Sequence, residues 1–305
     1  MVLFIVRRLW LAALVCLTVL VVSFILTHLS GDLAASIAGP NASAADVAII
    51  TKNYGLDRPL VVQFLEWASH AAEGDLGRSF LYHVPVWGLI RDRLPVTLTL
   101  GLTGLAIALL VALPLGILAA VREGTAMDRS IMMVALLGQA MPGFWFGLVM
   151  IVLLGVDLQW LPISGVDTWQ GYIMPGVVLA FSAIPALMRL TRSGMIDALA
   201  ADYIRTARAK GLSRASIILK HALRNAAMPV VSIAAVQLGF MLGGSVVIES
   251  VFSWPGIGRM AVDAAFSRDY PILMGLLLML AALVALGNLL TDLAYGVIDP
   301  RIKLS

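Results

Sequence analysis

Six long apolar runs divide this chain, and most of its polar positions lie between them. The runs cover residues 9–29, 96–121, 131–156, 173–190, 228–248 and 272–294. A helix of roughly 20 apolar residues crosses the hydrocarbon of a bilayer, which is about 30 Å thick. Each run therefore predicts one spanning helix, and we expect an all-α integral membrane protein with six transmembrane helices.

The first run could also be read as a secretory signal peptide, because Arg7 and Arg8 precede it. Its apolar stretch is longer than the roughly 7–15 residues typical of such a signal, and the sequence around 27–30 is a poor cleavage site. We therefore predict an uncleaved first transmembrane helix.

The segment 30–95 is the one sizeable piece predicted outside the cytoplasm, and its pattern indicates short helices. Ser43 and Asp46 have the spacing of a capping box, which would open a helix that stops at Gly55. The pattern predicts three further elements: a helix at 60–72, a turn at 74–77 and a helix at 85–94. The segment either caps the external mouth of the protein or contacts a partner.

Helix breakers and small residues recur within the predicted spans. The breakers are Pro114, Pro142, Gly143, Gly147, Pro175, Pro185, Gly243 and Gly244. Small residues that permit close helix contact are Gly101, Gly104, Ala106 and Ala108. This mixture suits helices that move against one another, but it also suits any well-packed bundle.

Composition and charge add an orientation to this picture. The chain is 60% hydrophobic and 13% charged, whereas a soluble domain has roughly 25% charged residues. Its net charge of +3 is too small to indicate nucleic-acid binding, and the single Cys16 allows no internal disulfide. Basic residues gather at 7–8, 122–129, 191–227 and 301–303, so the positive-inside rule predicts that both termini are cytoplasmic.

Few amide or carboxylate side chains lie in or next to the predicted spans: Gln139, Gln237, Glu249, Asn288 and Asp292. Polar and ionisable groups inside a membrane often mark functional sites, so Gln139, Gln237 and Glu249 are candidates for a gate or solute pathway. Glu249 and Asp292 fall near the ends of their runs, where water is close. Helix-end solvation or an interhelical hydrogen bond is therefore the alternative for them.

Motifs for catalysis, nucleotide binding and metal binding are missing from the sequence. None of the four lysines lies in a phosphate-binding G-x-x-x-x-G-K-[ST] loop, and the four histidines lack metal-ligand spacing. Ser245 has no suitable histidine base within the membrane, because His28 and His221 sit at or beyond its edge. We therefore expect no catalytic residue, no bound metal or cofactor and no enzymatic activity in this chain.

The basic segment 191–227 is too polar to span and too patterned to be a linker. Asp197 and Asp202 come early and basic residues come late, which agrees with the dipole of one helix. Gly211 would stop this helix and Ser213 would cap the next one, whose apolar face contains Ile217, Ile218, Ala222 and Leu223. Attraction to anionic lipid would explain the charge, but not the interruption at Gly211.

This segment resembles the cytoplasmic coupling loop of ABC-importer permeases of the dipeptide/oligopeptide/nickel type. The resemblance rests on Tyr203-Ile-Arg-Thr-Ala-Arg-Ala-Lys-Gly-Leu212, His221-Ala-Leu-Arg-Asn-Ala226 and Pro229. The match to the general E-A-A-x-x-x-G signature is partial, because Arg205-Thr-Ala207 stands where Glu-Ala-Ala would be, a form seen in the peptide branch. Other matching segments run nearly end to end, among them Tyr54-Gly-Leu-Asp-Arg-Pro59, Gly74-Asp-Leu-Gly-Arg-Ser79, Trp254-Pro-Gly-Ile-Gly-Arg259 and Arg268-Asp-Tyr-Pro271.

The resemblance implies the first permease subunit of an ATP-driven importer, with a type I transmembrane fold and transport by alternating access. It implies three kinds of protein partner: a second homologous permease, two cytoplasmic ATPases that hold ATP and magnesium, and an extracytoplasmic solute-binding protein. The lipid bilayer is the further partner that the apolar runs predict. The residues implied in ATPase coupling are Tyr203, Arg205, Thr206, Ala207, Arg208, Ala209, Lys210, Gly211 and Leu212.

The apolar runs predict a domain organisation, and the resemblance implies a class of solute. Residues 1–29 would hold the first helix, 30–95 the extracytoplasmic segment, 96–294 a five-helix core with the coupling loop 191–227, and 295–305 a cytoplasmic tail. Dipeptides, oligopeptides or glutathione are the expected solutes, with a nickel or metal chelate or an opine as the alternative. A stand-alone secondary transporter is less favoured, because no internal repeat or proton relay is evident.

Overall fold

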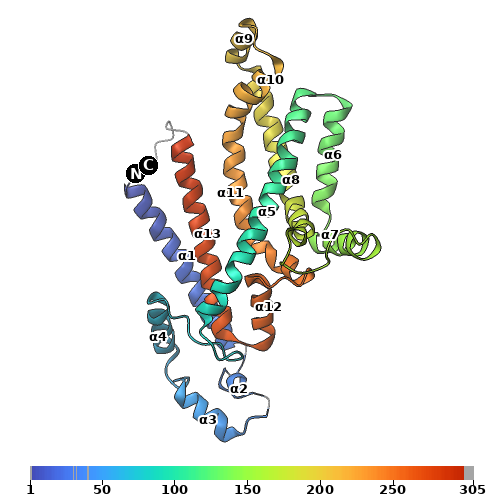
Figure 1. The fold of residues 1–305 in the computed structure, drawn as a ribbon. Helices are drawn as coiled ribbons and strands as arrows, with labels where there is room; N and C mark the ends of the chain where they lie inside the picture. Colours follow the sequence, from blue (N-terminus) through green and yellow to red (C-terminus); the bar gives the residue numbers. More distant parts are fainter. Residues whose placement is uncertain (1, 30, 32, 40, 299–305) are drawn as a thin grey trace. The chain divides into compact units, whose positions relative to one another are not determined.

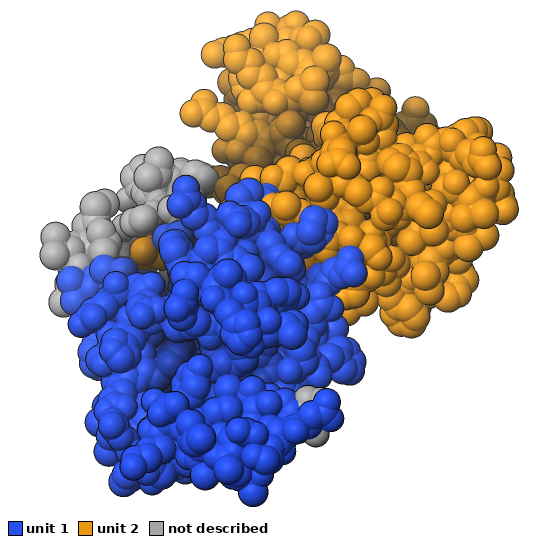
Figure 2. Space-filling view, turned by 60° about the horizontal axis from the view of Figure 1, so that its bottom comes forward, with its two compact units in different colours: residues 1–95, 255–286, 305 blue, residues 96–254, 287–304 orange. Residues whose placement is uncertain are grey.

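The computed structural model describes residues 2–29, 31, 33–39 and 41–298. These residues form helices and loops (Figure 1). Arg78 and Pro85 in addition form an isolated antiparallel β-bridge. The chain divides into two compact units, coloured separately in Figure 2. Unit 1 contains Met1–Pro95 and Pro255–Leu286, and unit 2 contains Val96–Trp254 and, from Gly287, the end of the last helix.

Unit 1 combines helices from both ends of the sequence. They are α1 (Val2–Leu29), α2 (Leu33–Ala38), α3 (Ala44–Asn53), α4 (Leu60–Ala72), the start of α5 (Val86–Val121), α12 (Ile257–Ser267) and most of α13 (Tyr270–Ile298). Its core packs Val86 and Ile90 of α5 against Ile257, Met260 and Ile272, all of them buried. The apolar face of α12 is therefore covered within the unit.

The short helices of unit 1 follow the local signals in the sequence. Ser43 and Asp46 form the predicted capping box at the start of α3. Gly55, just beyond the end of α3, has a φ of +63°, which suits glycine. The predicted bounds of α4 are confirmed, but the separate helix predicted at 85–94 is wrong. That stretch is the first part of α5, which continues through Pro95 without a break.

The buried carboxylate of Asp269 ties two loops of unit 1 together. It accepts hydrogen bonds from the hydroxyl of Ser79 at 2.5 Å and from the backbone N–H of Leu81 at 3.0 Å. Asp269 immediately precedes α13, so the same side chain holds the loop after α4 at the start of the last helix. This contact gives a structural reason for the motifs that contain Ser79 and Asp269.

Unit 2 is a helical bundle in which α8 is central. Its elements after α5 are α6 (Ala126–Ala140), α7 (Gly143–Met150), a π-helical stretch (Ile151–Asp157), a 3-10 turn (Trp169–Tyr172), α8 (Ile173–Ala200), α9 (Asp202–Ala209), α10 (Arg214–Ser216), a second π-helical stretch (Ile217–Ala222) and α11 (Leu223–Val251). α8 contacts α6, α7 and α11. Gly104 and Gly116 of α5 let that helix approach Leu179 and Thr191 of α8.

The predicted spans correspond to helices, with one correction. Among the residues that the structure describes, five helices are long and apolar enough to cross a membrane. α6 with α7 and the following π-helical stretch makes a sixth candidate, which is bent by 97°. The prediction of one helix over 131–156 is therefore wrong. Met141 is extended and Pro142 has no N–H to donate to the preceding turn, so α6 ends and α7 starts in a new direction.

Two boundaries in the basic segment also differ from the prediction. The fourth span does not end near residue 190, because α8 continues to Ala200 with Met195 and Ala198 buried on its inner face. Asp197 consequently belongs to the last turns of α8, whereas Asp202 starts α9. The prediction that both carboxylates begin one helix is therefore wrong. Arg301 and Lys303, which enter the orientation argument, lie outside the described residues.

Candidate functional site

The connection between α8 and α11 is a compact helix–turn–helix at one end of unit 2 (Figure 1). Gly211 follows α9 with a φ of +75°, a left-handed conformation that is costly for residues with a β-carbon. The hydroxyl of Ser213 then accepts a hydrogen bond from the N–H of Ser216 and caps the next turn. Both local predictions, the stop at Gly211 and the cap at Ser213, are confirmed.

The helix α9 has one face buried within this chain and one face exposed. Ile204 and Ala207 are 0% and 6% exposed and pack among Met195, Ile217 and Ala222. The other residues implied in ATPase coupling are exposed: Tyr203, Arg205, Thr206, Arg208, Ala209, Lys210, Gly211 and Leu212. Ala207 therefore fixes α9 to its own subunit, while the other eight residues are accessible for docking.

The sequence prediction did not include Ile204, although a local signal for it exists. Ile204 and Ala207 are three residues apart, so they share a face of the helix. Their burial positions α9 against Ala120 of α5 as well as against the start of the next helix. A displacement of α9 would thus be passed to the ends of α5 and α8 through packed side chains.

An ion pair, also missed from the sequence, holds the neighbouring part of the bundle. Arg192 of α8 donates to both carboxylate oxygens of Asp128, from Nε to Oδ1 at 2.6 Å and from Nη2 to Oδ2 at 2.7 Å. Asp128 also accepts from the N–H of Gly124 at 3.0 Å, and its side chain is 5% exposed. The first turn of α6 is therefore fixed to α8 some turns before α9 begins.

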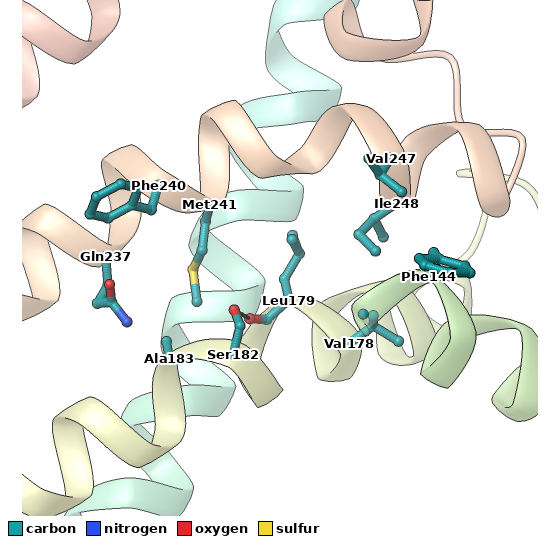
Figure 3. Close-up of a pocket in the computed structure, with 11 residues that line it drawn as sticks. Phe144, Val178, Leu179, Ser182, Ala183, Gln237, Phe240, Met241, Val247 and Ile248 are labelled. Carbon is teal, nitrogen blue, oxygen red and sulfur yellow. Dashed lines mark hydrogen bonds between the residues drawn. The ribbon is translucent and has the colours of Figure 1, made fainter. Parts of the chain in front are cut away.

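A cavity of about 310 Å³ lies between α7, α8 and α11 (Figure 3). Its lining is mostly apolar, with Phe144, Leu179, Phe240 and Met241 among the larger side chains. Gln237 of α11 and Ser182 of α8 are the polar side chains that line it. The Ser182 hydroxyl donates to the carbonyl of Leu179 at 2.8 Å, so Gln237 is the lining group with a full amide to offer a solute.

The three predicted pathway residues are placed differently by the structure. Gln237 lines the cavity, whereas Gln139 is exposed near the end of α6 and is not among the lining residues. Glu249 is 0% exposed and accepts a hydrogen bond from the hydroxyl of Thr97 at 2.7 Å. The expectation that water reaches Glu249 at a helix end is therefore wrong, because α5 and Trp254 enclose this end of α11. The alternative of an interhelical hydrogen bond is confirmed for this residue.

Within the part of the chain that the structure describes, no group of three His, Cys, Asp or Glu side chains could hold a metal ion. The exposed face of α9 and the cavity beside Gln237 are the two features of unit 2 best suited to contact something outside this chain. One offers basic and small residues on a short helix, and the other an apolar chamber with an amide group.

Comparison with known proteins identifies the kind of protein to which these features belong. The family model for the inner membrane component of binding-protein-dependent transport systems matches residues 112–304, and the model for its N-terminal part matches residues 1–101. The chain belongs to this family. The predicted resemblance to ABC-importer permeases is thereby confirmed.

Curated permeases match over almost the whole chain. The oligopeptide transport system permease protein AppB of Bacillus subtilis (strain 168) is 40% identical over 98% of this chain and 99% of its own. The glutathione transport system permease protein GsiC of Escherichia coli (strain K12) is 42% identical over 93% of each. Our chain is accordingly a permease subunit of an ABC importer, a multi-pass protein of the inner membrane and not itself an enzyme.

Solved structures show the same transmembrane fold. A chain of the methionine ABC transporter in an inward-facing conformation has a TM-score of 0.58 at 20% identity and covers 69% of the permease and 96% of that chain. An amino acid ABC transporter solved with histidines gives a TM-score of 0.51 at 16% identity, over 70% of the permease and 94% of that chain. The type I importer fold predicted from the sequence is confirmed by these likenesses.

Proposed function

We propose that this permease moves small peptides or peptide-like solutes across the inner membrane, with dipeptides, oligopeptides and glutathione as the solute class. The observation that carries the proposal is full-length similarity at 40% and 42% identity to permeases named for oligopeptides and for glutathione. The names of these relatives do not favour the nickel, metal-chelate or opine alternative. A stand-alone secondary transporter is likewise not favoured by membership of the family.

The proposed partners are a second homologous permease, two cytoplasmic ATPases that hold ATP and magnesium, and an extracytoplasmic solute-binding protein. With both termini in the cytoplasm, α9 would face the ATPases. Its exposed residues, from Tyr203 to Leu212 without Ile204 and Ala207, would then form the docking surface. ATP binding would move α9, and the packing of Ile204 and Ala207 would pass this movement to α5 and α8.

The cavity between α7, α8 and α11 is the proposed part of the solute pathway in this subunit. Gln237 supports this assignment, because its amide can donate to and accept from the peptide groups of a solute. Glu249 would act indirectly. It follows the cavity residue Ile248 in α11, and its hydrogen bond to Thr97 would hold this part of α11 against α5. Gln139, exposed on α6, has less support as a pathway residue.

Uptake by the complete transporter in proteoliposomes tests the solute class. We expect ATP-dependent uptake of labelled glutathione or a short peptide when the binding protein is present, and no uptake of a nickel chelate. Uptake of the chelate alone would refute the peptide assignment. Transport by this permease without any ATPase would refute the proposed mechanism.

Two matched pairs of variants test the docking surface. Ala209→Trp enlarges the exposed face of α9, whereas Ala207→Trp enlarges its buried face. We expect Ala209→Trp to leave the subunit folded and to uncouple ATP hydrolysis from transport, and Ala207→Trp to reduce stability. Arg205→Glu should weaken coupling, while Lys52→Glu, an equal charge change on α3, should not. Normal coupled transport in Ala209→Trp and Arg205→Glu would contradict the docking proposal.

A further inference from the structure

Unit 1 contains a cavity of about 400 Å³ to which the proposed function assigns no role. It is lined by the last turns of α1, the start of α2, the end of α3, α4 with the turn before it and the loop after it, and the start of α13. The lining combines aromatic rings, including Phe24, Trp67 and Phe80, with polar groups, including Asn53, Glu66 and His70. Its volume falls within the range of small-molecule sites, which is about 300–1,000 Å³.

Hydrogen bonds within the chain hold the walls of this cavity in place. His28 of α1 approaches the carbonyl of Phe24 with Nδ1 at 2.9 Å and Oε1 of Gln63 on α4 with Nε2 at 3.1 Å. The amide nitrogen of Gln63 donates to the carbonyls of Leu56 and Arg58 at 3.1 and 2.8 Å, which fixes the direction of its oxygen. The ring of Phe24 packs edge-on against Phe64 at 5.4 Å. The end of α1 is therefore joined to α4, and the cavity exists before any ligand binds.

Polar side chains on the wall have hydrogen-bonding capacity left for a ligand. The side chains of Asn53, Trp67 and His70 make no hydrogen bond with other described residues, and each can donate one. Glu66 offers a carboxylate. It forms a surface ion pair with Arg58 at 2.5 Å, in which the Glu66 side chain is 51% exposed and the Arg58 side chain 54% exposed. Donors that suit a phosphate thus line the same cavity as an acceptor that suits an ammonium group.

The position of the cavity along its helices points to the membrane as the source of the ligand. Its lining takes Phe24, Thr27 and His28 from the end of α1 and Tyr270 and Met274 from the start of α13, and both helices are candidate spans. The ends of spanning helices lie at the level of lipid headgroups, where Trp and Tyr side chains are enriched. Most of the apolar surface of α1 is exposed in this chain, as expected for a helix that faces lipid.

We propose that this cavity binds one phospholipid with a phosphoethanolamine headgroup. Glu66 accepts from the ammonium group, the donors of Asn53, Trp67 and His70 face the phosphate, and the aromatic rings around Phe24 contact the glycerol and the first part of the acyl chains. The site concerns a structural lipid and is independent of the solute that the transporter carries.

Native mass spectrometry of the assembled transporter tests the proposal. The complex is extracted from nanodiscs that contain equal amounts of phosphatidylethanolamine and phosphatidylglycerol, and the retained lipid is identified. We expect one phosphatidylethanolamine per permease. Glu66→Gln should lower its retention by about tenfold, because one charge-assisted hydrogen bond is lost. Glu66 is half exposed, so this change leaves the fold intact.

Two control variants separate the site from general effects. Arg58→Gln breaks the same ion pair but keeps the carboxylate, and it should retain the lipid as well as or better than the wild type. Glu73→Gln removes a charge at the exposed end of α4, outside the cavity lining, and should change nothing. Equal retention of both lipids, or unchanged retention in Glu66→Gln, would overturn the proposal. If no lipid is retained and free ethanolamine or a dipeptide binds in the cavity instead, the ammonium group does not come from a lipid and the proposal is overturned.

Discussion

The contact between α5 and α8 at Gly116 gives the sharpest test of how these helices pack. A β-carbon added at Gly116 would lie 2.7 Å from Cβ of Thr191 and 2.8 Å from the carbonyl oxygen of Met188. Carbon atoms in good contact are about 3.5–4.0 Å apart. The oxygen belongs to the backbone of α8, and the Thr191 hydroxyl is held by the carbonyl of Leu187 at 2.7 Å. Neither neighbour can move away without a shift of the helix.

Gly116→Ala should therefore destabilise the permease, although alanine is the better helix former. Overpacking costs about 1–3 kcal/mol, and a collision with backbone places the change in the upper part of that range. Alanine's helix propensity offsets about 1 kcal/mol of this cost. We expect a net loss of about 1–2 kcal/mol, as the difference between these two effects.

Gly239→Ala is the matched control, because Gly239 also lies inside a long helix but a β-carbon added there would have no atom within 4 Å. It should keep or raise the stability, by up to about 1 kcal/mol. Thermal unfolding of the two variants and the wild type in the same detergent gives the comparison. The reasoning is refuted if Gly116→Ala melts at or above the wild-type temperature, since α5 and α8 would then not approach each other so closely.

Three further predictions follow from local contacts. Asp128→Asn should destabilise unit 2 by about 1.5–3 kcal/mol, because Arg192 loses a charged acceptor. A double-mutant cycle with Arg192→Gln should show that the two changes are coupled. Additive effects on stability would contradict the ion pair. Hydrogen bonds from the Ser43 hydroxyl and backbone N–H hold the pKa of Asp46 below its usual value. The carboxylate should thus stabilise the start of α3 fully above about pH 4 and lose this effect as the pH falls through the lowered pKa. The difference in amide exchange at residues 44–50 between the wild type and Asp46→Asn should disappear in acid, and a constant difference would count against it. Pro142→Ala restores a backbone donor at the bend and should lengthen the distance between spin labels on the far ends of α6 and α7; an unchanged distance would mean that packing alone sets the 97° bend.

Local signals in the sequence predicted the elements whose causes are themselves local. The capping box of Ser43 and Asp46, the stop at Gly211 and the cap at Ser213 each depend on residues within three or four positions. Their geometry is set by the backbone of one turn, so distant contacts do not alter it. The motif that implied the coupling residues also lies in one short stretch, but the structure was needed to separate the buried Ala207 from the eight exposed ones.

The ends of the spans were harder to predict, because hydropathy reports contact with lipid and not the extent of a helix. Residues 191–200 are polar enough to end an apolar run, yet α8 continues through them with Met195 and Ala198 turned inward. Likewise, the run 131–156 is apolar on both sides of Pro142, so its composition does not indicate the direction in which α7 leaves α6. Helix length and bend depend on packing partners that a hydropathy profile does not contain.

Glu249 shows the same limit at a single residue. Its position at the end of the apolar run 228–248 suggested contact with water, and the structure places it at 0% exposure. Thr97, its hydrogen-bond donor, lies 152 positions away in the sequence, and the enclosing Trp254 belongs to the turn that follows α11. Water access at a helix end is decided by the segments that cover it. A carboxylate enclosed in this way must satisfy its oxygens within the protein, since a buried acceptor without a donor costs about 1–3 kcal/mol or more when charged. Thr97→Val should therefore disturb the contact between α5 and α11 more than a threonine-to-valine change on the exposed surface would.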